Sequence, residues 1–359
     1  MPGSRQAAQA LLVFVAAGAA LVPRPEPVIE RVYGGGVYPP LQAVVTGASN
    51  LMPLAVFDVA IVVAVVLLGW WWTRALSALW RRRDWRPPGR ALAATATLAA
   101  VAYLWFLAVW GLNYARPPLE VRLALPAVTP TPGDVAALLV QSVAEANALY
   151  RDAHHDDGLV PYGAEHSVAT ALHAVEARHG RPRPTGPGTP KPTLLAPYFR
   201  MAGVDGLTAP LALETLLNPD LTGPERPFVL AHEWAHLAGY AAEADANFVA
   251  WLVAQEPGTA ATTRYSGALF VLSEAARQVP AEVRRASMAA LGSGPRQDLA
   301  DIASRMASRV DLVERIGWRV YDSYLRSQGV DEGVRSYSRV VELIVRARRQ
   351  GGAAPAVPH

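Results

Sequence analysis

The chain contains no cysteine among its 359 residues. This absence excludes disulfide bonds and thiolate metal ligands, and it is compatible with an oxidising compartment without establishing one. Charged residues are also scarce, at 18% of the chain, whereas apolar residues make up 52%. That balance is shifted towards the composition of membrane proteins. The length suffices for a membrane anchor and one domain with its own core.

The sequence also lacks the features of a nucleic-acid-binding protein. It shows no basic stripe interleaved with aromatic residues and no zinc-finger spacing. The formal net charge is only +3, and six of the arginines belong to one short segment between two apolar runs. We therefore expect no nucleic-acid partner.

Two long runs near the N-terminus are almost free of charge. Residues 53–72 contain one charged side chain, Asp58, and residues 91–112 contain none. Each run can cross a hydrocarbon core of about 30 Å. A shorter apolar run over residues 7–22 predicts either a first membrane helix or a cleaved signal sequence. Asp58 lies near the outer end of its run, which favours a capping or interfacial role over a functional site inside the membrane.

The charges between the two long runs predict the orientation in the membrane. That segment holds one acid, Asp84, against Arg74, Arg81, Arg82, Arg83, Arg86 and Arg90. Such an excess of arginine marks a cytoplasmic loop. We therefore expect residues 1–115 to form a membrane anchor in the lipid bilayer, and residues 116–359 to form a domain outside the cytoplasm.

The clearest chemical signal is an HExxH pattern in which His232 and His236 flank Glu233. Two histidines four residues apart lie on one face of a helix and can bind one metal ion, with the glutamate placed to handle a proton. Pro227 suits the first helical turn, and Gly239 suits a left-handed stop. The pattern predicts a short metal-binding helix.

A second helical pattern after Gly239 offers two acids as the third ligand, Glu243 and Asp245. Glu243 shares a helix face with Asn247, whereas Asp245 points about 200° away from Glu243. We predict Glu243 as the ligand and Asn247 as the acceptor of the free ring N–H of a metal-bound histidine. The alternative is that neither acid binds a metal, and that both lie in the first turn of a helix because the helix dipole stabilises negative side chains there.

His232, His236 and Glu243 would leave one position open on a tetrahedral Zn²⁺, as catalytic sites require. Zinc lowers the pKa of water and polarises a carbonyl group. Glu233 would then act as general base towards water and as acid towards the leaving amine. These residues predict a zinc-dependent endopeptidase that acts on a peptide or protein substrate.

The same residues resemble a known clan of enzymes. Glu243 and Asn247 after HExxH are similar to the Glu-x-x-x-Asp/Asn element of gluzincin metallopeptidases, the clan that includes thermolysin. Residues 110–119, 232–252, 324–329 and 333–341 together resemble a bacterial family of unknown function, described as membrane-bound HExxH zinc metallopeptidases. The resemblance implies a multi-pass protein of the bacterial inner (plasma) membrane and names no substrate.

The fold that the resemblance implies is mainly α. Three N-terminal transmembrane helices, at about residues 7–22, 53–72 and 91–112, would precede a helical gluzincin-like zinc peptidase domain with a small β element. The resemblance assigns residues 211–217 to a strand bordering the cleft, although an ordinary core strand or a helix fits the same residues.

The helical patterns of the domain begin and end at recognisable residues. Asp134 suits the cap of a helix that runs to about residue 154, and Gly180 suits the stop of a helix over residues 165–179. From residue 262 onwards the pattern is almost wholly helical, with breaks at Pro280, residues 292–295 and Gly329.

A zinc peptidase also needs a donor for the oxyanion of the reaction. In gluzincins this donor comes from the helical segment after the third ligand. On that resemblance Tyr337, which follows Ser336, is the first candidate and Tyr265 the second. Each tyrosine could instead pack in the core with its hydroxyl satisfied.

Two other interpretations fit parts of the sequence. In the first, the chain is a non-catalytic membrane protein with a structural metal site or none, but such a site has no use for Glu233 as a base. In the second, HExxH lies inside the bilayer. The charges of Glu225, Arg226, Glu243 and Asp245 flank the motif too closely for a membrane span.

Overall fold

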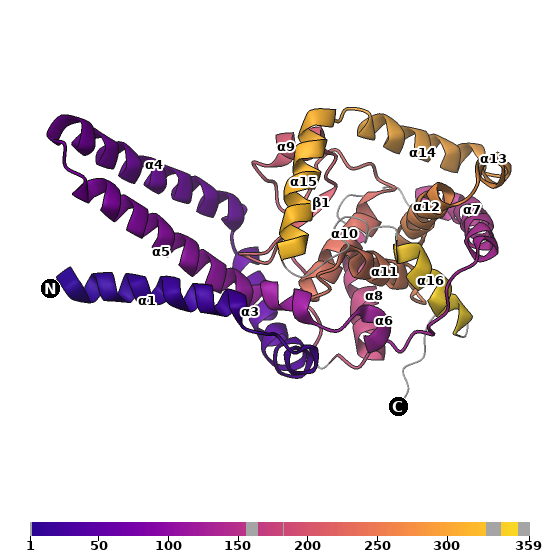
Figure 1. Cartoon of the computed structure of the whole chain (residues 1–359). Helices are drawn as coiled ribbons and strands as arrows, with labels where there is room; N and C mark the ends of the chain where they lie inside the picture. Colours follow the sequence, from indigo (N-terminus) through magenta and orange to yellow (C-terminus); the bar gives the residue numbers. More distant parts are fainter. Residues whose placement is uncertain (1, 156–163, 182, 328–338, 351–359) are drawn as a thin grey trace.

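The computed structural model describes residues 2–155, 164–181, 183–327 and 339–350. The fold is mainly helical, as predicted, and three long N-terminal helices project from one side of a helical domain (Figure 1). The β element is small, because the described residues contain a single sheet of two strands.

Two helices are long and apolar enough to cross a membrane, α4 (Val56–Arg82) and α5 (Arg86–Val109). They coincide with the two long apolar runs that the sequence predicted as membrane helices. The helix α4 continues ten residues beyond the predicted end at Trp72 because residues 73–82 contain neither glycine nor proline. It ends at Arg83, which adopts a left-handed conformation with φ 48°.

A third span depends on how the first helices are counted. The helix α1 (Pro2–Leu21) runs beside α5 (Figure 1). Its residues 6–21 and the helical segment of residues 26–50 together meet the length and hydropathy of a span, but they bend by 112°. The structure therefore contains two helices that could cross a membrane, or three if this bent pair is one span.

The segment after α1 packs into the domain. It forms α2 (Glu26–Val28), a π-helical turn η1 (Ile29–Val37) and α3 (Tyr38–Asn50). Tyr38 is fully buried in the main hydrophobic core, and its hydroxyl donates a hydrogen bond to the Leu237 carbonyl oxygen at 3.0 Å. Residues on the anchor side of the predicted boundary at residue 115 thus contribute to the core of the domain.

The middle of the chain forms η2 (Gly111–Ala115), α6 (Leu119–Arg122), α7 (Pro132–His155), α8 (Ala164–Arg178) and α9 (Ala196–Ala202). Gly180 ends α8 with φ 66°, as predicted. The cap of α7 differs from the prediction. Thr131 Oγ1 accepts from the Asp134 N–H at 3.2 Å, and Asp134 Oδ2 accepts from the Thr131 N–H at 2.7 Å. Thr131 is the cap and Asp134 its reciprocal partner.

The two strands pair antiparallel ahead of the HExxH helix. The strand β1 (Gly206–Ala209) pairs with β2 (Glu214–Leu217), so that Gly206 lies opposite Leu217. The predicted strand over residues 211–217 is thus confirmed only in its second half. Residues 210–213 form the turn, which begins with Pro210, a residue that cannot donate a ladder hydrogen bond.

The remainder is helical: α10 (Arg226–Leu237), α11 (Glu243–Gln255), α12 (Ala261–Gln278), α13 (Ala281–Ala289), α14 (Ser293–Met306), α15 (Asp311–Ser327) and α16 (Arg339–Arg349). Pro280 and Gly292 separate helices as predicted. The break between α14 and α15 was not predicted, because its residues include neither glycine nor proline. A tertiary contact accompanies it, since the Val310 N–H donates to the Met201 carbonyl oxygen at 2.9 Å. Gly329 lies outside the described residues.

A buried ion pair joins the sheet to the start of α4. Lys191 donates to Glu214 at 2.6 Å and to the Ser49 carbonyl oxygen at 2.6 Å. Glu214 also accepts the N–H groups of Val56 and Phe57, the first two residues of α4. Burial raises the pKa of Glu214, but Lys191 and these N–H groups outweigh burial and hold the pKa below its ordinary value.

Lys191→Met is expected to lower the free energy of unfolding by about 3–5 kcal/mol, because it leaves the Glu214 carboxylate buried without its cation. Since the pKa of Glu214 is depressed in the folded state, the stability from this carboxylate is present at neutral pH and is lost as the pH falls below about 4.5. Thermal unfolding at pH 7 measures the loss. The double variant Lys191→Met, Glu214→Gln should regain most of it, and an unchanged transition in Lys191→Met would contradict the prediction.

Candidate metal centre

The helix α10 holds the HExxH residues and is fixed at both ends. Pro227 lies in its first turn, and Gly239 follows it with φ 82°, as predicted. The Gly239 N–H donates to the His236 carbonyl oxygen at 2.7 Å, and the Tyr240 N–H donates to the Ala235 carbonyl oxygen at 3.1 Å. This left-handed turn redirects the chain into α11, which begins at Glu243.

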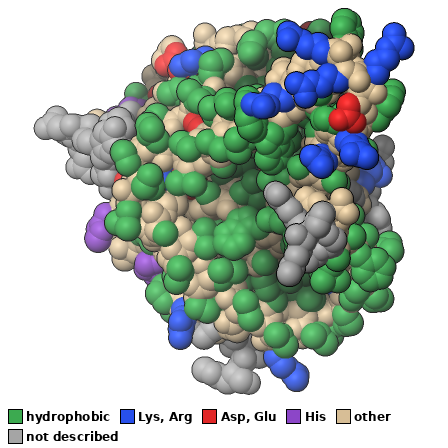
Figure 2. Space-filling model, turned by 90° about the vertical axis from the view of Figure 1, so that its left-hand side faces the viewer, with side chains coloured by type: hydrophobic (Ala, Val, Ile, Leu, Met, Phe, Trp, Pro, Cys, Tyr) green, Lys and Arg blue, Asp and Glu red, His purple; other side chains and the backbone are tan. Residues whose placement is uncertain are grey.

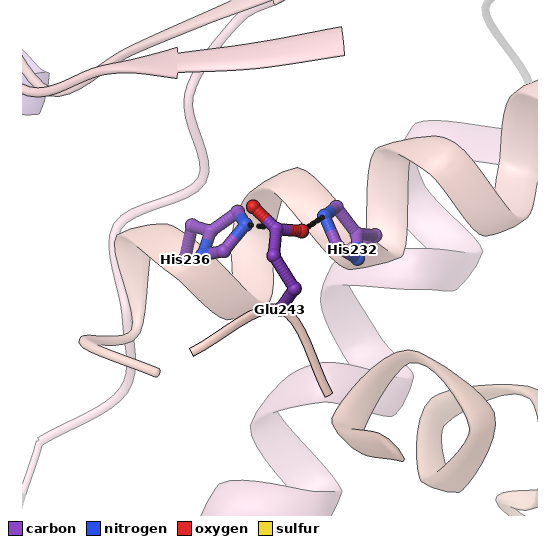
Figure 3. A group of neighbouring side chains, drawn as sticks. All are labelled: His232, His236 and Glu243. Carbon is purple, nitrogen blue, oxygen red and sulfur yellow. Dashed lines mark ion pairs between the residues drawn. The ribbon is translucent and has the colours of Figure 1, made fainter. Parts of the chain in front are cut away.

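The turn brings Glu243 between the two histidines of α10 (Figure 3). Glu243 Oε2 lies 3.3 Å from His232 Nε2 and 3.7 Å from His236 Nε2. The ligand atoms of the three side chains all lie within 4.8 Å of one another. His232, His236 and Glu243 are the group in the described residues that could hold a metal ion.

The donor atoms suit a zinc ion. Ligand atoms about 2.0–2.2 Å from zinc lie roughly 3.3–3.5 Å apart at the corners of a tetrahedron. The observed distances of 3.3 and 3.7 Å are close to that spacing. Two imidazole nitrogens and one carboxylate oxygen also match the donor set of catalytic zinc sites. The residues therefore fit such an ion.

The orientation of His236 is set by a backbone carbonyl. Its Nδ1 lies 2.7 Å from the Tyr240 carbonyl oxygen, an acceptor, so Nδ1 carries a proton and Nε2 is the ring nitrogen directed at Glu243 and the metal position. The prediction that Asn247 accepts the ring N–H is wrong for His236, because the turn at Gly239 places the Tyr240 carbonyl oxygen beside Nδ1. His232 Nδ1 is buried and has no hydrogen-bond partner in the described residues.

Asp245 is buried next to Glu243 in sequence but faces a different group of charges. Burial raises its pKa to about 6, while Arg122 and Arg339 oppose the rise. Its carboxylate is absent from the group formed by His232, His236 and Glu243. The helical geometry of α11 thus separates the two acids as predicted.

Glu233 lies between the histidines and is held by strand β1. Thr208 Oγ1 is 2.8 Å from Glu233 Oε2 and 2.8 Å from the Glu233 carbonyl oxygen. Gly206 lies so close that a Cβ atom there would be 2.5 Å from Glu233 Oε1. A side chain at residue 206 would displace the carboxylate, so the glycine permits the strand to approach it. The strand that borders Glu233 is therefore β1 and not the predicted segment 211–217.

The charges around the group influence one another strongly. Burial raises the pKa of Glu233, and the two histidines oppose that rise only in part. Burial disfavours a charged His236, but the Glu243 carboxylate outweighs burial and raises the pKa of His236 to about 9. Burial likewise disfavours a charged Glu243, but His236 and His232 hold the pKa of Glu243 well below its usual range. The positive charge of His236 and the negative charge of Glu243 therefore stabilise each other.

Of the two predicted tyrosines, the structure describes Tyr265, whose hydroxyl bonds outside this group. Tyr337 lies outside the described residues. Tyr265 is buried, and its hydroxyl donates to Asp298 in α14. A tyrosine that the sequence did not single out does reach the centre, because the Tyr321 hydroxyl in α15 donates to Glu243 Oε1. No local signal marks Tyr321, since 78 residues separate it from Glu243.

Fold and site together define a mainly helical protein with two or three helices able to cross a membrane and a buried His–His–Glu group that could hold a metal ion. The chain belongs to the family described as Protein of unknown function (DUF3810), whose family model matches residues 33–345. No curated protein and no solved structure matches the chain. The family description assigns no activity, and the matched range contains His232, Glu233, His236 and Glu243.

Proposed function

We propose that the protein is a membrane-anchored, zinc-dependent endopeptidase. The observation that carries the proposal is the convergence of His232, His236 and Glu243 on one point, with Glu233 held beside them by Thr208. Three protein ligands leave a position open on a tetrahedral ion, which is the arrangement of catalytic zinc sites. The gluzincin-like assignment rests on the HExxH and Glu243 spacing.

In the proposed reaction, some residues bind the metal ion and Glu233 transfers the proton. His232, His236 and Glu243 hold the ion, and the Tyr240 carbonyl keeps the Nε2 atom of His236 free to bind it. A zinc ion, when bound, polarises a carbonyl group and makes water acidic near neutral pH. Glu233 takes a proton from the attacking water and returns it to the leaving amine. Burial raises the pKa of Glu233, which favours its acceptance of the proton.

Strand β1 is the element best placed to align a substrate. It lies against Glu233 through Thr208 and Gly206. An extended peptide that runs along this strand would bring a scissile bond to the carboxylate, as in other strand-addition complexes. The substrate class proposed is therefore an extended segment of a peptide or protein.

The rival is a membrane protein whose metal site is structural. A structural site has no use for Glu233, and the contacts of Glu233 with Thr208 favour the enzyme. A peptide-library digest of the purified full-length protein tests the choice. We expect cleavage that a chelator abolishes and added Zn²⁺ restores. A protein that binds zinc but cleaves nothing in the library would support the structural site.

Tyr321→Phe is expected to weaken zinc binding by about ten- to a hundredfold, because the hydroxyl holds the carboxylate of a ligand. Its bond to Glu243 Oε1 leaves Oε2 directed at the histidines. Competition with a zinc chelator measures the affinity. Tyr265→Phe is the matched control and should change nothing, since its hydroxyl bonds Asp298. Equal affinities in both variants would remove Tyr321 from this role.

The orientation of the domain follows from the arginines near the turn between α4 and α5. We propose that this turn is cytoplasmic and the metal centre extracytoplasmic, in a bacterial inner membrane. A reporter enzyme that is active only in the periplasm, fused after Gly351, is expected to be active. Activity of a matched cytoplasmic reporter at the same position would reverse the orientation.

A further inference from the structure

The helix that carries Tyr321 presents an apolar stripe on its outer face. Leu312, Ile316 and Val320 follow one another at four-residue intervals and share one face of α15. Their exposed fractions are 59%, 52% and 66%. A helix on the surface of a water-soluble domain carries polar residues on that face. Tyr321 points to the inner side, where it meets Glu243.

Arginines border the stripe. Arg315 and Arg319 each precede an apolar residue of the stripe, and both are exposed. Apolar side chains on one face with basic side chains beside them are typical of helices that lie in a membrane interface. The long arginine side chain can reach lipid phosphates while its stem stays against apolar surface.

The stripe continues onto α9, which packs against α15. The Val310 N–H donates to the Met201 carbonyl oxygen at 2.9 Å, and a Cβ atom at Gly317 would lie 2.8 Å from the Tyr198 hydroxyl. Around these contacts Leu194 is 71% exposed, and Tyr198 and Met201 are each 39% exposed. The two helices thus form one unit with an apolar outer side.

This unit lies at the level where the apolar helix α4 begins. Asp58, in the first turn of α4, accepts the Leu194 N–H at 2.7 Å and the Thr193 hydroxyl at 2.9 Å. Asp58 therefore joins the start of α4 to the segment that leads into α9. On the neighbouring helix α5, Trp105 donates to the Leu211 carbonyl oxygen at 2.8 Å. The domain surface that carries Leu194 thus meets α4 and α5 where they would enter a bilayer.

The arrangement of the helices also places α15 near the point where α4 and α5 would enter a bilayer. In Figure 1, α15 runs across the direction of α4 and α5, beside their domain ends. Viewed from the side on which the long helices project, hydrophobic side chains cover much of the surface (Figure 2). A helix in this position would lie flat on the membrane that α4 and α5 cross.

We propose that α9 and α15 rest on that bilayer, with Leu312, Ile316 and Val320 among the lipids of the leaflet next to the domain. Arg315 and Arg319 then lie at the level of the phosphates. The proposal requires α4 and α5 to span a membrane, and it does not depend on peptidase activity. It places the helix that contacts Glu243 between the lipid surface and the metal centre.

The experiment uses the absence of cysteine, because one introduced cysteine is then the only labelling site. Ile316→Cys, carrying a nitroxide, is reconstituted as the full-length protein in vesicles of equal parts phosphatidylcholine and phosphatidylglycerol. Collisions with oxygen report lipid, and collisions with a water-soluble nickel chelate report solvent. Val63→Cys in α4 is the lipid control, and Ala286→Cys, exposed in α13, is the water control.

The oxygen-to-nickel collision ratio at residue 316 is expected to approach that at Val63 and to exceed severalfold that at Ala286. Labels at Leu312→Cys and Val320→Cys should behave like the label at 316. A ratio equal to that of Ala286 at any of the three positions would overturn the proposal. Protection from both reagents would also overturn it, because it would show that protein and not lipid covers the stripe.

Discussion

Glu233→Gln is expected to lower the rate of peptide hydrolysis by about a hundred- to ten-thousandfold, because it removes the general base. The same variant should keep its metal, since His232, His236 and Glu243 are unchanged. Glutamine has nearly the size of glutamate and can still accept the hydrogen bond from Thr208. The loss would therefore report chemistry and not a displaced side chain.

Two measurements on the same preparation check this result. Metal analysis gives the zinc content per chain, and a fluorogenic peptide chosen from the library digest gives the rate. Thr208→Val is a useful companion, because it removes the hydrogen bond to Glu233 and should reduce turnover less than Glu233→Gln does. Turnover of Glu233→Gln close to that of the unmodified protein would exclude Glu233 as the base.

Glu243→Ala is expected to release zinc far more readily than Asp245→Ala. Glu243 lies within 3.3 Å of His232 Nε2 and 3.7 Å of His236 Nε2, whereas Asp245 faces arginines. Loss of a direct ligand should weaken binding by more than about a hundredfold, the upper end of the effect of an outer-sphere partner. Zinc content after gel filtration, with circular dichroism as a test of folding, measures the difference.

Asp245→Ala is the matched control because it removes a buried carboxylate from the same helix turn. Retention of zinc in Asp245→Ala together with its loss in Glu243→Ala would support the ligand set. Loss of zinc in Asp245→Ala alone would show that α11 presents the other acid to the metal.

The parts of the site that the sequence predicted are those that depend on nearby residues. His232, Glu233 and His236 are set by one helix, whose start at Pro227 and stop at Gly239 are local signals. Glu243 followed from the 100° rotation per residue in the next helix. The wrong prediction of the cap of α7 also has a local cause, since the side chains of Thr131 and Asp134 can both cap a helix.

The missed parts depend on contacts between distant segments. Thr208 reaches Glu233 from a strand 25 residues earlier, and Tyr321 reaches Glu243 from a helix 78 residues later. Tyr38 packs under the end of α10 from a segment 199 residues away. Periodicity and capping describe elements one at a time, so they do not show which elements meet. The break before α15 was not predicted for the same reason, because there the Val310 N–H bonds to Met201, a residue of a distant segment.

X-ray absorption at the zinc edge of the purified, zinc-loaded protein tests the central claim most directly, because it reports the atoms bound to the metal. We expect two imidazole nitrogens and oxygen ligands at about 2.0–2.2 Å, with loss of one imidazole contribution in His236→Ala. A spectrum without imidazole scattering, or one that His236→Ala leaves unchanged, would contradict the assignment of the metal centre to His232, His236 and Glu243.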